Sequence, residues 1–129
     1  MESIIVISKV KKHVKEKYGF NTSSNFFDPI NKDLYQALDK ASEHTKSTDR
    51  KTVMGRDFNF YLDKPEVDAI LVVASKIKSY VKETHGLSTS KQVMEQLTVR
   101  IEKIIENAAK KATEAKRKTI MDRDIEEIV

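Results

Sequence analysis

The sequence predicts an all-α protein built from two similar helical units, and three observations support this prediction. Residues 50–57 recur as residues 117–124, with six of the eight positions identical. Sliding the chain by the same 67 positions carries residues 6–58 onto residues 73–125 without a gap. Apolar residues in both copies recur at the period of an amphipathic helix. Two copies are too few for a solenoid, which needs at least about three, so we expect the units to pair with each other.

The composition sets limits on what the protein does. The chain of 129 residues has no cysteine, which excludes disulfides and thiolate chemistry and favours a reducing, interior compartment. No apolar run approaches the roughly 20 residues of a membrane span, and the first residues do not resemble a secretion signal, so we expect a cytoplasmic protein with no membrane partner. A net charge of +4 is mild. Binding to nucleic acid would therefore depend on where the positive charges lie.

Each unit begins with a short apolar segment and a short basic helix. Residues 4–7 and 70–73 are equivalent under the repeat, and the sequence leaves open whether they form a strand end or a first helical turn. Ser8 is a suitable N-cap for the first helix. Gly19 and Gly86 are expected to end the two helices, since glycine adopts the left-handed C′ conformation at little cost.

A long amphipathic helix follows in each unit. Thr22 with Asn25, and Thr89 with Gln92, have the spacing of a capping box at its start. Proline is tolerated in a first turn, which places the start of the first long helix near Asp28. The helices are expected to end near residues 45–49 and 113–116. The apolar stripes consist of Phe26, Ile30, Leu34, Ala37, Leu38 and Ala41 in the first copy and of Val93, Leu97, Ile101, Ile104, Ile105, Ala108 and Ala112 in the second.

A short third helix is expected after each repeated basic stretch. Thr52 and Thr119 are placed to cap it, and Asp122 lies at the third position after Thr119, where a carboxylate favours the helix dipole. The turn-forming residues after position 62 indicate a linker. We therefore expect one unit over residues 1–62, a linker over 63–69 and a second unit over 70–129.

The repeated stretch Arg-Lys-Thr-Val/Ile-x-x-x-Asp-Phe/Ile resembles the second loop and third helix of archaeal and bacterial histones. The segment Ser-Lys-Val/Ile-Lys-x-x-Val-Lys-Glu, followed by glycine and Thr-Ser, is similar to the first helix and first loop of short bacterial histones. The resemblance covers nearly the whole chain twice. It implies a histone doublet: tandem histone folds of short, long and short helices, paired within one chain as a handshake pseudo-dimer.

The resemblance also implies a function, which is nonspecific binding of double-stranded DNA by a chromatin-like, nucleoid-associated protein. In the family, the second loop of one fold lies beside the first loop of its partner. Residues 21–23 would then lie beside 117–119, and residues 88–90 beside 50–52. Backbone N–H groups at such helix starts suit phosphate oxygens. The expected DNA-binding residues are Lys9, Lys11, Lys12, Thr22, Ser23, Lys51, Thr52, Lys76, Lys78, Thr89, Ser90, Lys118 and Thr119.

The resemblance gives the arginines of the repeated stretch a structural role. In the family, an arginine and an aspartate at this spacing pair and hold the loop on the third helix, so we expect salt bridges from Arg50 to Asp57 and from Arg117 to Asp124. Archaeal histones carry an arginine in the first loop, where this chain has only Asn, Thr and Ser. Coating, bending and bridging of DNA stay open. So does the role of Met54 and Met121, either in the core or as exposed apolar contacts.

A protein-interaction module and an enzyme are the two alternatives to a DNA-binding protein. Histone folds also serve as protein-interaction and dimerisation modules, but both copies keep Arg-Lys-Thr in the loop, which favours DNA. An enzyme is not expected, because the sequence has no glycine-rich phosphate loop and no nucleophile elbow. His13, His44 and His85 lack metal-ligand spacing, so neither a metal nor a cofactor is expected. The sequence leaves open whether the units pair within one chain or between chains, and whether pseudo-dimers associate further.

Overall fold

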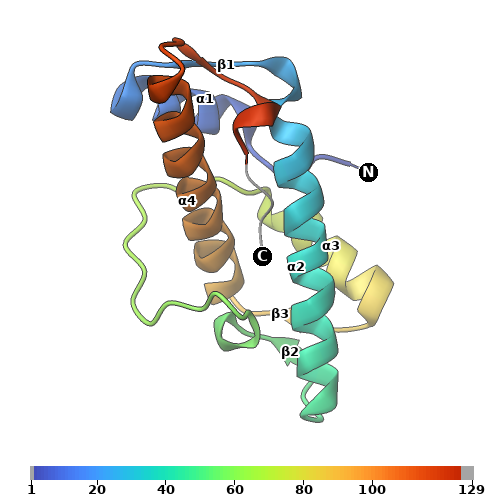
Figure 1. The fold of residues 1–129 in the computed structure, drawn as a ribbon. Helices are drawn as coiled ribbons and strands as arrows, with labels where there is room; N and C mark the ends of the chain where they lie inside the picture. Colours follow the sequence, from blue (N-terminus) through green and yellow to red (C-terminus); the bar gives the residue numbers. More distant parts are fainter. Residues whose placement is uncertain (1, 126–129) are drawn as a thin grey trace.

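The computed structural model describes residues 2–125, and this part of the chain is mostly helical. Two short helices, α1 (Ile7–Tyr18) and α3 (Ala74–His85), each precede a long one, α2 (Phe27–Ser47) and α4 (Gln92–Glu114). The long helices contact each other, and Figure 1 shows α1 behind α4 and α3 behind α2. The all-α class predicted from the sequence is confirmed.

The two halves are related by a pseudo-two-fold axis. The Val6 N–H donates to the Leu71 carbonyl at 2.8 Å, and the Val73 N–H donates to the Ile4 carbonyl at 2.8 Å. These two bonds exchange places under the 67-residue shift. The apolar segments whose form the sequence left open are therefore strand-like, and they cross as an isolated antiparallel bridge.

The long helices hold this bridge in place with equivalent side chains. Asn31 of α2 accepts the Ile4 N–H at 2.9 Å, and Thr98 of α4 accepts the Leu71 N–H at 3.1 Å. Since both bonds are buried, each satisfies a backbone group that would otherwise be costly to remove from water. The start of each half is thereby tied to a long helix of the same half.

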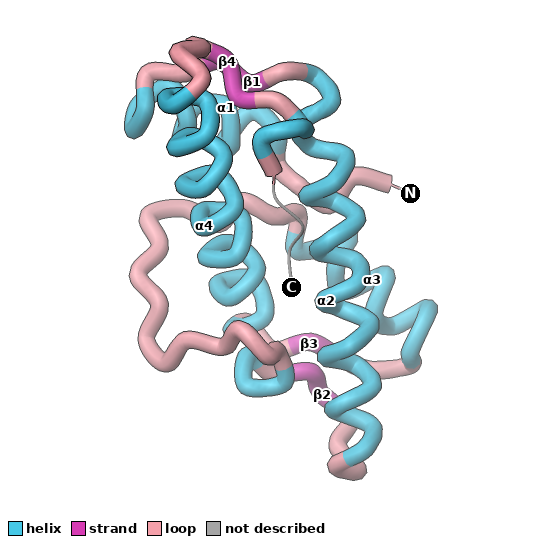
Figure 2. The backbone as a smooth tube through the Cα atoms, in the orientation of Figure 1, coloured by secondary structure: helices cyan, strands magenta, loops and turns pink. Residues whose placement is uncertain are grey.

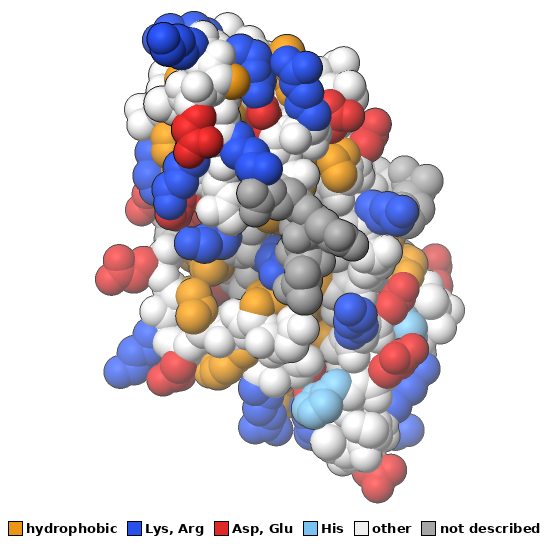
Figure 3. Space-filling view, in the orientation of Figure 1, with side chains coloured by type: hydrophobic (Ala, Val, Ile, Leu, Met, Phe, Trp, Pro, Cys, Tyr) orange, Lys and Arg blue, Asp and Glu red, His pale blue; other side chains and the backbone are white. Residues whose placement is uncertain are grey.

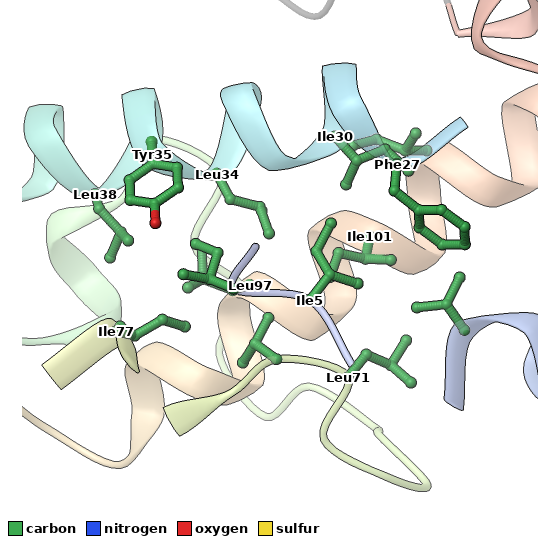
Figure 4. Close-up of a cluster of buried hydrophobic side chains, with 14 of the residues drawn as sticks. Ile5, Phe27, Ile30, Leu34, Tyr35, Leu38, Leu71, Ile77, Leu97 and Ile101 are labelled. Carbon is green, nitrogen blue, oxygen red and sulfur yellow. The ribbon is translucent and has the colours of Figure 1, made fainter. Parts of the chain in front are cut away.

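One hydrophobic core fills the space between the halves. Figure 4 shows Leu34 and Leu38 of α2 facing Leu97 of α4 and Ile77 of α3, with Leu71 of the connecting segment nearby. All five side chains are buried. Because each fully buried aliphatic side chain contributes about 1.5–3 kcal/mol, pairing of the long helices supplies much of the stability. This arrangement is the physical reason for the apolar stripes along both long helices.

The helix ends agree with the sequence at the glycines and differ at the caps. Gly19 and Gly86 adopt φ values of 72° and 70°, and their N–H groups close the last turns of α1 and α3. The predicted capping role of Ser8 is wrong, since α1 begins one residue earlier with Val6 in the N-cap position. The two predicted capping boxes are also wrong. No side chain caps α4, whose N-cap residue is Lys91, and the Ser23 hydroxyl, not Thr22, contacts Asn25.

The third short helix expected in the first half is absent from the structure. A single 3-10 turn, η2 (Gly55–Asp57), takes its place, and the chain then runs without a helix to α3. One cause lies in Gln96 of α4, whose side chain accepts the Leu62 N–H at 2.9 Å and donates to the Leu62 carbonyl at 2.7 Å. These bonds hold the segment against α4 and occupy backbone groups that a helix would need. In the second half only the equivalent turn, η3 (Asp122–Asp124), lies within the described residues.

Candidate nucleic-acid interface

Each end of the molecule carries a pair of loops, one from each half. Strand β1 (Asn21–Thr22) pairs in parallel with β4 (Thr119–Ile120), and β2 (Thr52–Val53) pairs in parallel with β3 (Ser88–Thr89). Figure 2 shows these pairs at opposite ends of the long helices. The loop pairing expected from the sequence is therefore present at both ends. Thr52 and Thr119 lie in these strands, so their predicted role as helix caps is wrong.

Backbone hydrogen bonds hold each pair of loops together. The N–H groups of Asn21 and Ser23 donate to the carbonyls of Lys118 and Ile120 at 2.9 and 3.0 Å. At the other end, the N–H groups of Ser88 and Ser90 donate to the carbonyls of Lys51 and Val53 at 3.0 and 2.8 Å. These four N–H groups are therefore used inside the protein. They are not available to phosphate oxygens.

An arginine and an aspartate fasten the β4 loop to η3. One guanidinium nitrogen of Arg117 donates to Asp124 Oδ2 at 2.9 Å and to the Thr119 carbonyl at 2.9 Å, and the other nitrogen contacts Asp124 Oδ1. The Met121 N–H donates to the same carboxylate at 2.8 Å. Asp124 is buried, so its charge is balanced by these donors and not by water.

The β2 loop has an equivalent clamp with more donors. Arg50 contacts both carboxylate oxygens of Asp57, and the Met54 N–H donates to Asp57 Oδ2 at 2.7 Å. In addition, the Thr45 hydroxyl donates to Oδ2 at 2.8 Å, and the His44 Nδ1 lies 2.8 Å from Oδ1. Both salt bridges expected from the sequence are thus present. They turn the two arginines towards the protein and not towards a ligand.

The clamps change the acidity of both aspartates. Burial pushes the pKa of Asp57 upward, but hydrogen bonds from Arg50, the Met54 N–H, His44 and Thr45 together hold that pKa well below its usual range. The hydrogen bond from Arg117 is the main reason why the pKa of Asp124 lies below its usual value. Both carboxylates are therefore ionised at neutral pH and keep the loops closed.

Met54 and Met121, whose roles the sequence left open, occupy the positions just before the two 3-10 turns. Their N–H groups complete the clamps, and both residues are half-buried. Neither is a free, exposed apolar contact. The backbone of each methionine thus contributes to loop geometry, whatever its side chain touches.

The exposed charge at the loop pairs comes from lysines. Lys51 and Lys118 are exposed, and neither has an ion-pair partner within residues 2–125. Lys15 of α1 reaches Asn21 in the β1 loop, with Nζ 3.5 Å from Oδ1. Lys116 is exposed just before the β4 loop. Figure 3 shows basic side chains over both ends of the face in view.

Sequence reasoning left Lys15 and Lys116 out of the candidate site. Two signals in the chain could have included them: Lys15 has an equivalent lysine, Lys82, under the 67-residue shift, and Lys116 directly precedes the repeated Arg-Lys-Thr. What places Lys15 at the site is the fold, because Asn21 pairs with Thr119 about a hundred residues away along the chain.

The loop hydroxyl groups are less accessible than the lysines. Thr22, Ser23, Thr52 and Thr119 are half-buried. At the β2–β3 end, the hydroxyl oxygens of Thr89 and Ser90 are buried and have no hydrogen-bond partner among the described residues. The structure therefore turns these two predicted contacts inward.

The first-helix lysines divide into free and engaged side chains. Lys9, Lys11 and Lys78 are exposed, and no ion pair holds them within residues 2–125. Lys12 is also exposed, with a loose 3.9 Å contact to Glu16 that contributes little. Lys76, in contrast, lies 3.0 Å from the Glu2 carboxylate and 3.4 Å from the Ser3 carbonyl. The structure thus places Lys76 in a contact with the N-terminal segment.

Comparisons with known proteins add no family: no family model matches the chain, and no curated protein is significantly similar to it. Among residues 2–125, no three His, Cys, Asp or Glu side chains are grouped so that they could hold a metal ion. No helix in this part of the chain is long and apolar enough to cross a membrane.

Proposed function

We propose that this protein is a histone doublet that binds double-stranded DNA through its phosphates, with little sequence preference. In this proposal the two halves are tandem histone folds paired as a pseudo-dimer, and the protein acts as an architectural component of the nucleoid. The observation that carries the proposal is the presence of two equivalent loop pairs. Each is closed by a buried Arg–Asp clamp and presents an exposed lysine, Lys51 or Lys118.

The chemistry of these surfaces favours phosphate over base recognition. Lysine ammonium groups neutralise phosphates and release counterions without reading base edges. The arginines of the Arg-Lys-Thr loops are occupied by aspartates, and the first loops carry no arginine, so the loops offer no free arginine for a bidentate contact with a base edge. Lys9, Lys11 and Lys78 extend the basic surface along α1 and α3.

The proposal is tested by fluorescence anisotropy with a random-sequence duplex at several salt concentrations. The variant Lys51→Gln/Lys118→Gln removes one charge from each loop pair and keeps the side-chain length. Its control, Lys40→Gln/Lys64→Gln, removes the same charge from two exposed lysines outside the loop pairs. Since each phosphate contact contributes about 0.9 to the slope of log affinity against log salt, we expect the loop variant to lose up to about 1.8 units of slope.

The control variant should keep the slope of the unaltered protein. Equal losses in both variants would show a diffuse charge effect and would contradict binding through the loop pairs. An unchanged slope in the loop variant would move the contacts to the lysines of α1 and α3. A protein that does not bind the duplex even at low salt would end the DNA proposal.

The second candidate function is a protein-interaction module, and a feature of the connecting segment favours it. Tyr61 and Leu62 expose large apolar side chains, and they directly follow the segment whose Phe58 and Phe60 line a hollow of about 380 Å³ against α2. Exposed apolar groups beside a hollow are typical of contact surfaces. Failure of DNA binding at low salt, with the fold intact by circular dichroism, would favour this candidate.

A further inference from the structure

Asp33 and Arg100 occupy the same position in the two copies and contact each other. Asp33 lies on α2, Arg100 lies on α4, and they are separated by the 67 residues of the repeat. Under two-fold symmetry, a residue touches its own equivalent only when it lies at the axis. Asp33 and Arg100 therefore lie at the pseudo-two-fold axis, where the first half meets the equivalent position of the second half.

The contact between the two side chains is a paired fork. Arg100 Nε lies 3.0 Å from Asp33 Oδ2, and Arg100 Nη2 lies 3.0 Å from Asp33 Oδ1. The side chains are only 17% and 13% exposed, and the Arg100 guanidinium carbon lies 4.7 Å from the centre of the Phe60 ring. Such a bidentate, largely buried pair has strict geometry and weak screening by salt.

We propose that Asp33 and Arg100 decide which halves pair, so that each half accepts the other and rejects a copy of itself. Pairing between two first halves would bring Asp33 against a second Asp33 at the axis. Pairing between two second halves would bring Arg100 against a second Arg100. Like charges placed together in a partly buried interface repel each other, whereas the mixed pair forms a salt bridge. The position thus excludes homotypic pairing between neighbouring chains.

A neighbouring position shows that this charge difference is not required to hold the fold. Asn31 and Thr98 are also equivalent under the repeat, and each accepts a backbone N–H from the start of its own half. Different side chains perform one task there, within each half, and both are uncharged. At 33 and 100, in contrast, the two equivalent side chains contact each other and carry opposite charges.

The first test measures unfolding of the full chain in denaturant for a set of charge variants. Asp33→Arg and Arg100→Asp create like charges, Asp33→Asn and Arg100→Gln are neutral controls, and Asp33→Arg/Arg100→Asp exchanges the two charges. We expect the unfolding constant to rise roughly ten- to a hundredfold in the neutral variants and further in the like-charge variants, with the exchange recovering most of the loss.

The order of these variants separates complementarity from other roles. If Arg100 acts only through Phe60, the exchange will be no more stable than Arg100→Asp alone, and the proposal is overturned. Like-charge variants that are as stable as the neutral variants would also overturn the proposal, because like charges at positions 33 and 100 would then not disfavour pairing of the two halves.

The second test asks whether the pair can be restored between chains. Asp33→Arg chains and Arg100→Asp chains are refolded separately and together, at concentrations that compete with the roughly millimolar effective concentration set by a short linker. Native mass spectrometry should show a one-to-one heterodimer only in the mixture, in roughly tenfold excess over homodimers. Homodimers of either variant in the same amount as the heterodimer, or dimers formed as readily by unaltered chains, would contradict the proposal. This result does not depend on DNA, so it stands apart from the proposed function.

Discussion

The two loop ends have the same backbone but carry different charges. Lys116 and Asp49 precede the two Arg-Lys-Thr loops and adopt nearly identical left-handed φ values of 58° and 57°. Both are exposed, so the β1–β4 end presents a lysine where the β2–β3 end presents an aspartate. Lys17 and Thr84 form a second such pair of equivalents. The repeat therefore preserves the backbone geometry of the two loop ends, while the charges on their surfaces differ.

The Arg–Asp clamps at the two ends differ in their number of hydrogen-bond donors, and here the β2–β3 end has more. Asp57, at the less basic end, receives Thr45 and His44 in addition to its arginine and methionine donors. The positions equivalent to these two residues are Ala112 and Lys111, and Ala112 offers no donor to Asp124. The hydroxyl of Thr45 therefore gives the clamp at the β2–β3 end a donor that Ala112 cannot supply, and the β1–β4 end carries exposed lysines at 17 and 116, where the other end has Thr84 and Asp49. Under the proposed function, we expect the β1–β4 end to bind DNA more tightly.

The largest expected effect comes from removing one clamp at a time. Asp57→Asn leaves Arg50 without its partner, and breaking a buried pair in this way costs about 3–5 kcal/mol. Asp124→Asn should cost less, by roughly the 1–2 kcal/mol that the extra donors to Asp57 contribute. Denaturant unfolding of both variants checks the order. Equal losses would show that Thr45 and His44 add nothing.

Acid should open both clamps. Because the folded-state pKa of each aspartate is lowered, the stabilisation is fully present above the unfolded pKa of about 3.9 and is lost as the pH falls towards the folded value. The free energy of unfolding, measured by urea titration from about pH 6 to about pH 2, should therefore decrease with falling pH. The decrease should be smaller in Asp57→Asn than in the unaltered protein. An unchanged pH dependence in that variant would contradict the assignment.

Exchanging the charges at the loop starts should reverse the comparison on the surface. Lys116→Asp makes the β1–β4 end resemble the other one, and we expect duplex affinity at low salt to fall by roughly tenfold, since the change removes one attractive charge and adds a repulsive one. Asp49→Lys should raise affinity by a similar factor. Thermal unfolding serves as the control, because both positions are exposed. If neither variant alters affinity, DNA does not contact the loop starts.

The smallest effect is expected from making the first clamp resemble the second. Thr45→Ala introduces the residue found at the equivalent position 112 and removes one hydroxyl donor from Asp57, at a cost of about 1 kcal/mol. When Asp57→Asn and Asp124→Asn are made in the Thr45→Ala protein, the difference between their losses of unfolding free energy should shrink by the same amount. A double-mutant cycle measured by denaturant unfolding tests this coupling.

Several parts of the site were predictable because they depend on short spacings within the repeat. The Arg50–Asp57 and Arg117–Asp124 pairs each lie within one repeated stretch, and the resemblance of that stretch to histone loops implied both salt bridges. The exposure of Lys51 and Lys118 followed from the same stretch. The ion pair between Lys76 and Glu2 was not predictable, because these two residues lie far apart in the sequence.

The amino-acid sequence by itself determined the helical class, the two-fold repetition, the glycines that end α1 and α3 and the apolar stripes of the long helices. Each of these follows from the residue types within one or two turns of chain. Only the tertiary structure decided that Ile5 and Val72 pair as an antiparallel bridge, that Gln96 binds the segment after η2 at Leu62, and that Asp33 meets Arg100. These outcomes depend on contacts between residues distant in sequence, which local propensity cannot specify because the partner is supplied by the fold.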